Sequence, residues 1–245
     1  MRLLAIESAG GAAGAALLSD GEVLAEEWIE ESLAEGRLLV PLIDRLVARA
    51  GSRPSDLDVV AVDLGPGSFT GIRIGVSIAK SLSFALRIPV IGLDRFDLAA
   101  FQAGETLGDF APVVDTRRGA VACAFFRRAA PGEAAVRLSA DLSLSPEELA
   151  RRIEESGGPL TLFGSGVEAC REALSRFTDL RFAPAELALV RPGTVARLAA
   201  LVHSGRDLSP LSGHQILDSS QSDALAPIYL RKTAAEERLA RGSPA

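Results

Sequence analysis

The sequence is poor in the side chains from which metal sites and disulfide frameworks are built. Its 245 residues include two histidines and two cysteines. His203 and His214 form neither a His-Glu-x-x-His motif nor a pair at helical spacing, so we expect no zinc site and no bound metal. Cys123 and Cys170 lack a Cys-x-x-Cys spacing, and we expect free thiols in a reducing compartment rather than a disulfide.

Two further absences concern positive charge and long apolar runs. The net charge of −6, from 26 basic and 32 acidic residues, leaves no basic excess with which the chain alone could grip a nucleic acid. No apolar stretch approaches the ~18 residues that a membrane-spanning helix needs, and Glu7 interrupts the short apolar run at the N-terminus. We therefore expect a cytoplasmic protein with no signal peptide and no contact with a membrane.

What is present is an aliphatic sequence with clear periodicity. Its composition, 48% hydrophobic and 24% charged, is ordinary for a folded domain. The first part predicts a hairpin meander followed by two helices and a parallel crossover, in the order β-β-β-α-β-α-β. We expect strands over 3–6, 12–19, 22–29, 58–64 and 89–93, and helices over 37–49 and 72–86.

A second unit follows a boundary that we place around residues 102–110. Its clearest signal is Ser145-Pro-Glu-Glu148, in which a capping serine precedes a proline and acidic residues, as is typical of a helix start. We expect strands over 111–115, 121–127 and 160–163, and further helices over 167–177 and 191–203.

Three glycine-containing turns could approach a phosphate group: 7–11, 65–71 and 164–166. Backbone N–H groups at the start of a helix bind anions. None of the three turns, however, carries the Gly-Lys-Ser/Thr of a P-loop or a complete Gly-x-Gly-x-x-Gly. For the turn at 65–71 we favour tight turning and close packing as the reason for the glycines. For the turn at 164–166 both interpretations stay open.

The chain offers little for nucleophilic catalysis. It has no Gly-x-Ser-x-Gly elbow, and Ser68 has no histidine in a suggestive position. Cys123 lies in a predicted strand, where a buried and inert thiol is expected. We therefore predict no catalytic residue.

The helix predicted over 72–86 is apolar or small on nearly all sides. Its charges, Arg73 and Lys80, fall on one narrow face. Such a helix is buried on more than one side, and the helix over 37–49 has a similar surplus of apolar residues. We expect the two helices to be neighbours on one face of the first sheet. We favour a subunit interface there over the competing interpretation, in which the second unit covers them.

The stretch over 65–75, Gly-Pro-Gly-Ser-Phe-Thr-Gly-Ile-Arg-Ile-Gly, resembles the hallmark of the bacterial TsaB (YeaZ) family. It is the specific motif, and supporting matches follow the family's order along nearly the whole chain, over 4–8, 37–44, 114–121, 162–166, 191–194 and 227–231.

This resemblance implies an α/β fold of two tandem actin/hexokinase/Hsp70-like domains, each with a ribonuclease-H-like mixed sheet and flanking helices. We expect residues 1–104 to form the N-terminal domain with the partner-binding helices. Residues 105–232 would form a reduced C-terminal domain of the same fold, and 233–245 a polar tail.

The resemblance also implies a non-catalytic scaffold role in making threonylcarbamoyladenosine, next to the anticodon of tRNAs that read codons starting with A. The TsaD paralogue carries the metal and transfers the threonylcarbamoyl group, and TsaE supplies an ATPase. TsaB pairs with TsaD, forms a homodimer when alone, meets tRNA only through the complex, and has no catalytic, cofactor or metal site of its own. By the resemblance, these residues lie on or near the partner-binding helices: Leu39, Ile43, Ile72, Arg73, Val76 and Lys80.

Two departures and two alternatives remain at this point. Residues 33–36, just ahead of the first predicted helix, lack the histidine that the family often carries there, which could alter partner contacts. Glu7-Ser8-Ala9 stands where the family usually has Asp-Thr-Ser, which weakens the case for nucleotide binding at that turn. A free-standing kinase or ATPase of the same fold would use Asp63 or Asp115 as its catalytic aspartate. A metalloprotease is disfavoured by the number of histidines.

Overall fold

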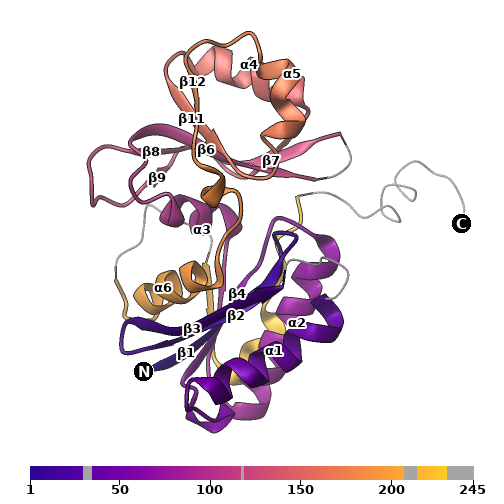
Figure 1. The fold of residues 1–245 in the computed structure, drawn as a ribbon, viewed down its shortest axis with the longest axis vertical. Helices are drawn as coiled ribbons and strands as arrows, with labels where there is room; N and C mark the ends of the chain where they lie inside the picture. Colours follow the sequence, from indigo (N-terminus) through magenta and orange to yellow (C-terminus); the bar gives the residue numbers. More distant parts are fainter. Residues whose placement is uncertain (30–34, 117–118, 207–213, 231–245) are drawn as a thin grey trace, which may run out of the picture.

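Two mixed sheets form the centre of the structure, a computed structural model that describes residues 1–29, 35–116, 119–206 and 214–230 (Figure 1). The first sheet has the order β13-β5-β4-β1-β2-β3 and the second β10-β7-β6-β11-β12, with β8 and β9 attached beside β6. The strands of the first sheet are β1 (Arg2–Glu7), β2 (Ala13–Ser19), β3 (Glu22–Ile29), β4 (Val59–Asp63), β5 (Val90–Leu93) and β13 (His214–Leu217). Those of the second are β6 (Gly108–Asp115), β7 (Val121–Cys123), β8 (Phe126–Arg128), β9 (Val136–Arg137), β10 (Leu142–Leu144), β11 (Leu160–Phe163) and β12 (Leu180–Phe182).

The two sheets repeat one topology. β1 pairs antiparallel with β2 and parallel with β4, and β6 pairs in the same way with β7 and β11. If β10 is taken as the third strand of the second half, both halves therefore run third-second-first-fourth-fifth across the sheet. This repeat confirms the predicted fold class of two tandem units with mixed sheets.

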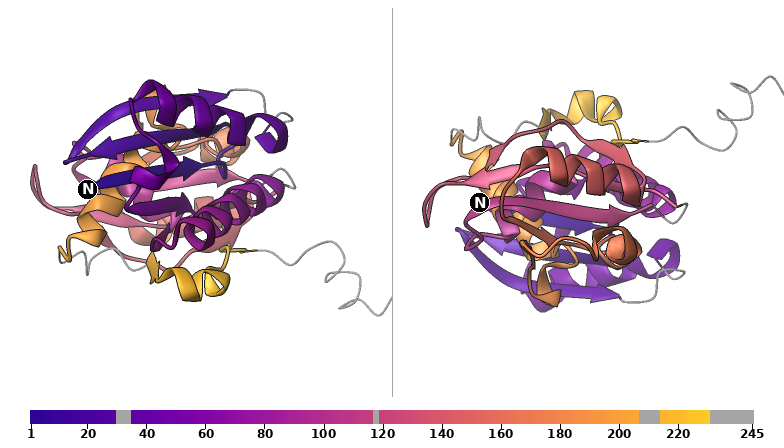
Figure 2. Two further views of the ribbon diagram at one scale, coloured as in Figure 1. Left: turned by 90° about the horizontal axis from the view of Figure 1, so that it is seen from below. Right: turned by 90° about the horizontal axis from the view of Figure 1, so that it is seen from above.

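Helices and sheets alternate in layers. α1 (Glu35–Arg49) and α2 (Phe69–Leu86) cover the outer face of the first sheet, α3 (Arg95–Gln102) and α6 (Pro192–His203) lie between the sheets, and α4 (Pro146–Ser156) with α5 (Arg171–Leu174) covers the second. Figure 2 shows α1 and α2 over the first sheet in one view and α4 over the second in the other. Each interlayer space holds its own apolar core, and the middle core draws residues from both sheets.

Local signals in the sequence produced the expected elements. Asp20 and Gly21 both have positive φ, 50° and 90°, as the two central residues of a tight hairpin turn require. Ser145 caps α4 in a reciprocal capping box with Glu148. These contacts confirm the predicted hairpin and helix start.

Several expectations need correction. α3 was not predicted, because its eight residues follow a strand directly and show no long period. The helix expected over 167–177 is divided into a 3₁₀ turn (Glu168–Cys170) and the four-residue α5. The strand expected over 121–127 is interrupted between β7 and β8.

The predicted division at 104/105 describes the strand repeat but not the path of the C-terminal part. α6 packs on β1 and β2, and β13 pairs antiparallel with β5 at the edge of the first sheet. Leu225 lies in the outer core of the first half. The described residues after 191 therefore return to the N-terminal half; the tail predicted over 233–245 lies outside the described residues.

The expectation that no apolar stretch approaches the length of a membrane-spanning helix needs correction. Within the described residues, α2 is long and apolar enough to cross a membrane by length and composition, with a mean hydropathy of 1.2. It packs one side on the first sheet through Ile72, Val76 and Ala79. A core helix of a soluble fold has the same composition, so α2 alone is weak evidence of a membrane protein.

Candidate functional site

The glycines of the 65–75 stretch allow close contact between backbone segments. A Cβ atom on Gly67 would lie 2.1 Å from the Ala9 carbonyl oxygen, and one on Gly75 would lie 2.3 Å from Ser8 Oγ. The Ser68 amide donates to the same Ala9 oxygen at 2.8 Å. The packing interpretation of this loop is therefore confirmed.

The neighbouring turn after β1 is filled by the chain's own charged groups. Glu7 Oε1 accepts hydrogen bonds from the amides of Ala9 and Gly10, both at 2.9 Å, and from the Arg95 guanidinium. Arg95 also lies 2.8 Å from Asp63 Oδ2 in a buried ion pair. The amides that could have received a phosphate thus bind a carboxylate, and a guanidinium covers Gly10. Glu7, the departure from the family pattern, is the residue that occupies this turn.

The turn at 164–166 is also engaged with its own sheet. Gly164 has a φ of 109°, and a Cβ there would lie 2.3 Å from the Val113 carbonyl oxygen. The Gly166 amide donates to that oxygen at 2.9 Å. Close packing, of the two open interpretations, is the one that this geometry favours.

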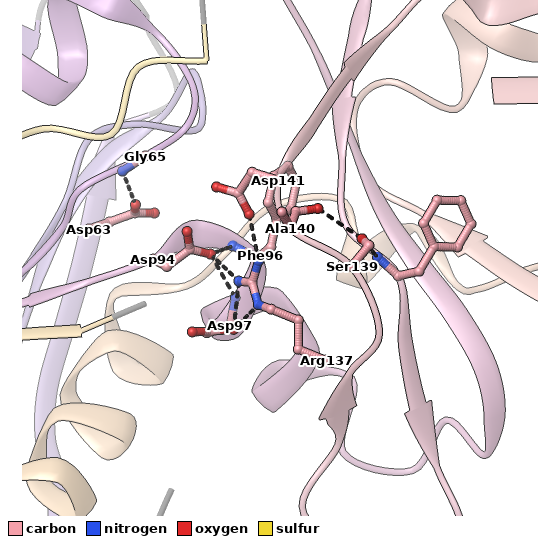
Figure 3. Close-up of polar contacts among 10 residues, drawn as sticks. Asp63, Gly65, Asp94, Phe96, Asp97, Arg137, Ser139, Ala140 and Asp141 are labelled. Carbon is pink, nitrogen blue, oxygen red and sulfur yellow. Dashed lines mark hydrogen bonds and ion pairs between the residues drawn. The ribbon is translucent and has the colours of Figure 1, made fainter. Parts of the chain in front are cut away.

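A second charged cluster joins the two halves through α3. Figure 3 shows the Arg137 side chain of β9 pointing between Asp94, Asp97 and Asp141. Its Nη2 lies 2.7 Å from Asp94 Oδ1 and 2.6 Å from Asp97 Oδ1, and its Nη1 contacts Asp141 at 2.5 Å. Burial raises the pKa of Asp94 to about 8, and Arg137 opposes that rise.

The other end of α3 is bound by Arg128 of β8. Its guanidinium donates to the carbonyl oxygens of Ala100, Ala103 and Thr106 at 2.8 to 3.1 Å. A cation on the last carbonyls of a helix satisfies acceptors that the helix itself leaves open. The second half therefore holds α3 at both ends.

An apolar groove opens on the outer face of α1 and α2. Its volume is about 460 Å³, and it is lined by Val40, Phe69, Thr70, Arg73, Ile74, Ser77 and Ile78. The Arg73 guanidinium lies 5.2 Å from the centre of the Phe69 ring, and the centre of the Tyr229 ring lies 5.1 Å from that of Phe69. Val40 is 56% exposed. Large apolar side chains thus gather around one exposed cation.

The predicted interface residues separate into two groups in the structure. Leu39, Ile43, Ile72 and Val76 belong to the outer core of the first half and are at most 7% exposed. They lie on α1 and α2 as expected, but their side chains are enclosed by the first half itself. The interface as such stays a prediction.

The remaining two predicted residues are near the surface. Arg73 is exposed in the groove, whereas Lys80 donates to the Asp223 carbonyl oxygen at 2.9 Å. Val40, Phe69 and Ile74 on the same two helices line the groove but are not among the predicted interface residues. Leu39 and Val40 are adjacent and both aliphatic, so only a helical-wheel analysis anchored to the sheet could have told them apart.

The other candidate residues form no second site. Among the described residues, no three His, Cys, Asp or Glu side chains are grouped so that they could hold a metal ion. Cys123 and Cys170 are free and buried, and burial raises the pKa of their thiols to about 12 and about 11. Asp63 is fully buried against Arg95, and the Asp115 amide donates to Ser165 Oγ at 3.3 Å.

Known proteins resemble this chain in sequence. A family model described as TsaD, tRNA N6-adenosine threonylcarbamoyltransferase, matches residues 34–238. The Escherichia coli protein named tRNA threonylcarbamoyladenosine biosynthesis protein TsaB is 28% identical over 98% of each chain. The Bacillus subtilis protein of the same name is 34% identical over 49% of this chain, a match that spans about half of that protein (53%).

Solved structures resemble the fold. YeaZ from Pseudomonas aeruginosa is 21% identical, with a TM-score of 0.69 over 93% of this chain and 100% of that one. A second solved structure, described as a protein with similarity to peptidase YeaZ from Pseudomonas aeruginosa, is 22% identical, with a TM-score of 0.73 over 94% of this chain and 99% of that one. At these identities the likeness concerns the fold, which extends over nearly the whole of each chain.

Proposed function

Because this chain belongs to the TsaD family and, within it, to the TsaB (YeaZ) proteins, we propose that it is the non-catalytic scaffold of a complex that makes threonylcarbamoyladenosine in tRNA. It pairs with the TsaD paralogue and, through it, with TsaE in the cytoplasm. The complex transfers a threonylcarbamoyl group to the adenosine next to the anticodon of tRNAs that read codons starting with A. This chain meets tRNA only through its partners.

The observation that carries this proposal is the exposed apolar groove on α1 and α2. A groove between two helices accepts the ridge of a third, and large apolar side chains around one cation are typical of the centre of an interface. Phe69 and Phe84 of α2 are 43% and 76% exposed although the same helix is buried on its other face. The first half thus keeps apolar surface that its own fold does not use.

Arg73 favours a different protein over a second copy as the occupant of the groove. In a two-fold symmetric dimer formed through this groove, both copies of Arg73 would enter one interface and repel each other. A paralogue with a carboxylate at the facing position would attract Arg73 instead. The groove therefore favours the heterodimer, and the homodimer is the assembly that we expect when the paralogue is absent.

The filled turn after β1 supports a scaffold over the alternative, a kinase or ATPase of this fold. A nucleotide phosphate would need the Ala9 and Gly10 amides, which are bound to Glu7, and the space over Gly10, which Arg95 occupies. Asp63, one candidate for a catalytic aspartate, is fully buried and paired with Arg95.

The test is size-exclusion chromatography with light scattering, on this chain mixed with the TsaD protein of the same organism. We expect a heterodimer, and we expect Phe69→Glu to weaken it at least tenfold, the loss of a central anchor being worth about 2 kcal/mol or more. The matched control is Phe182→Glu on β12, a residue that is 58% exposed in the second half. This variant should bind as the wild-type chain does.

The functional arm of the test is transfer of the threonylcarbamoyl group to tRNA by the reconstituted proteins. Phe69→Glu should abolish the stimulation by this chain, and Phe182→Glu should leave it. Absence of any heterodimer, together with ATP turnover by this chain alone, would overturn the scaffold proposal and support the kinase or ATPase.

A further inference from the structure

The carboxyl groups of Glu7 and Asp63 share one cation in the interior of the first half. Glu7 is 2%, Asp63 0% and Arg95 3% exposed. If both carboxyl groups were ionised, the cluster would carry one uncompensated negative charge out of contact with water. An uncompensated buried charge is strongly unfavourable, and a carboxyl group in that position tends to bind a proton.

The hydrogen bonds show where that proton belongs. Glu7 Oε1 accepts from the Ala9 amide, the Gly10 amide and Arg95, and Asp63 Oδ1 accepts from the Gly65 amide at 2.7 Å. The second oxygen of each group, Glu7 Oε2 and Asp63 Oδ2, is buried and receives no hydrogen bond. Asp63 Oδ2 lies 2.8 Å from Arg95 Nη2 as an ion pair, and Arg95 Nε in the same cluster is likewise buried without a hydrogen-bond partner.

We propose that one proton lies between Glu7 Oε2 and Asp63 Oδ2, so that the end of β1 is a buried proton-binding site rather than a phosphate-binding one. A single O–H···O bond gives both open oxygens a partner. It also makes the three-residue cluster electrically neutral, with one carboxyl, one carboxylate and one guanidinium. The proposal concerns this site alone and does not depend on the scaffold function.

The electrostatics of the site agree with this geometry. Burial raises the pKa of Glu7 well above its ordinary value; Arg95 opposes the rise, and the charge of Asp63 adds to it. Arg95 on α3 and Asp63 on β4 are the charged groups that act most on Glu7. Asp94, next to Arg95, binds Arg137 in the other cluster.

The site connects three segments: the turn after β1, the end of β4 and the start of α3. Residues 94 and 97, at the start of α3, in turn bind Arg137 of the second half. Above its ordinary pKa of 4.5, an unfolded Glu7 has released the proton that the folded chain retains. Stability therefore falls as pH rises from that value toward the raised pKa of the folded state. Within this window the unfolding constant changes up to tenfold per pH unit.

The test is proton release on urea unfolding near pH 7, measured for the wild-type chain and for Glu7→Gln. A glutamine amide donates to Asp63 Oδ2 as the protonated carboxyl would, so this variant should fold and release about one proton fewer. Asp63→Asn gives the same answer from the other side and serves if Glu7→Gln does not fold. Asp109→Asn is the control: the pKa of Asp109 lies below its ordinary value beside Arg127, so this variant should release as many protons as the wild-type chain.

Infrared spectra give an independent readout. The carbonyl band of a protonated carboxyl group should remain in Asp94→Asn and be lost in the double variant Glu7→Gln/Asp94→Asn. If Glu7→Gln and Asp63→Asn release as many protons as the wild-type chain, both carboxyl groups are ionised in the fold and the proposal is overturned. A weaker fall of stability with rising pH in both variants than in the wild-type chain would support the proton site, whatever the fate of the scaffold proposal.

Discussion

The two halves of the molecule repeat one strand order and differ in the helices that cover it. α1 and α2 have 15 and 18 residues, whereas α4 and α5, at the equivalent places in the second half, have 11 and 4. α4 buries Leu149, Ala150 and Ile153 and presents charged residues elsewhere. α2 buries one face and still exposes Phe69 and Phe84 on the other.

This difference lies in the outer helices, of which those of the first half keep a second apolar face. A helix that covers one sheet needs a single apolar face, and α4 has that and little more. The first half has long helices with a second apolar face and a groove between them. The second half instead supplies Arg137 and Arg128, which fix α3 and so join the halves.

The largest effect should come from the core that the halves share. Phe96 is fully buried between the two sheets, and Phe96→Ala should lower the free energy of unfolding by about 3–5 kcal/mol. Because both sheets contribute to this core, urea unfolding should show one transition, shifted as a whole. Phe182→Ala, at 58% exposure, is the matched control and should change little. Two separate transitions, only one of them shifted, would show that the halves fold independently.

The next effect concerns the ion pairs of Arg137 that join the two halves. Arg137→Met removes the cation that three carboxyl groups share. It should lower the free energy of unfolding by about 3 kcal/mol. Arg127 is also ion-paired, to Asp109, but its side chain is 59% exposed. Arg127→Met should therefore cost under about 1 kcal/mol. Equal effects of the two variants in urea unfolding would mean that the largely buried cluster around Arg137 adds no more stability than an exposed ion pair.

A smaller effect concerns the close contact in the first half. Gly67→Ala places a methyl group 2.1 Å from the Ala9 carbonyl oxygen, so the loops must separate, at a cost of about 1–3 kcal/mol. Gly104→Ala, whose Cβ would lie 3.7 Å from the Phe101 carbonyl oxygen, should stay within about 0.5 kcal/mol. Thermal unfolding of the two variants compares them, and a stable Gly67→Ala would show that this contact is not tight in solution.

The smallest effect concerns the rate at which a reagent labels the two thiols of the second half, and it needs no mutation. Cys123 and Cys170 both lie in the outer core of the second half, and burial raises the pKa of each thiol. In native protein at pH 8 a thiol reagent should label them no faster than the chain unfolds. Rapid labelling would show that the second half, with its short α5, opens while the first half stays folded.

Much of the fold was predictable because the signals are local. The Asp20-Gly21 turn, the Ser145 cap and the placing of α1 and α2 on one face follow from neighbouring residues and short periods. The return of β13 to the first sheet was not predictable, because His214–Leu217 finds its partner Val90–Leu93 only in the folded chain. The orientation of α1 was also open, since Leu38, Leu39 and Val40 are all apolar and only the sheet decides that Leu39 is the buried one.

The sequence by itself determined the family, the repeated α/β units and the glycine-rich turn, because motif spacing and side-chain period are properties of adjacent residues. Only the tertiary structure decided what fills that turn and which face is left for a partner. Arg95 meets Glu7 across 88 residues of chain, and Arg137 meets Asp94 across 43. Such ion pairs depend on how sheets and helices stack, and no local pattern encodes the distance between two side chains that the fold brings together.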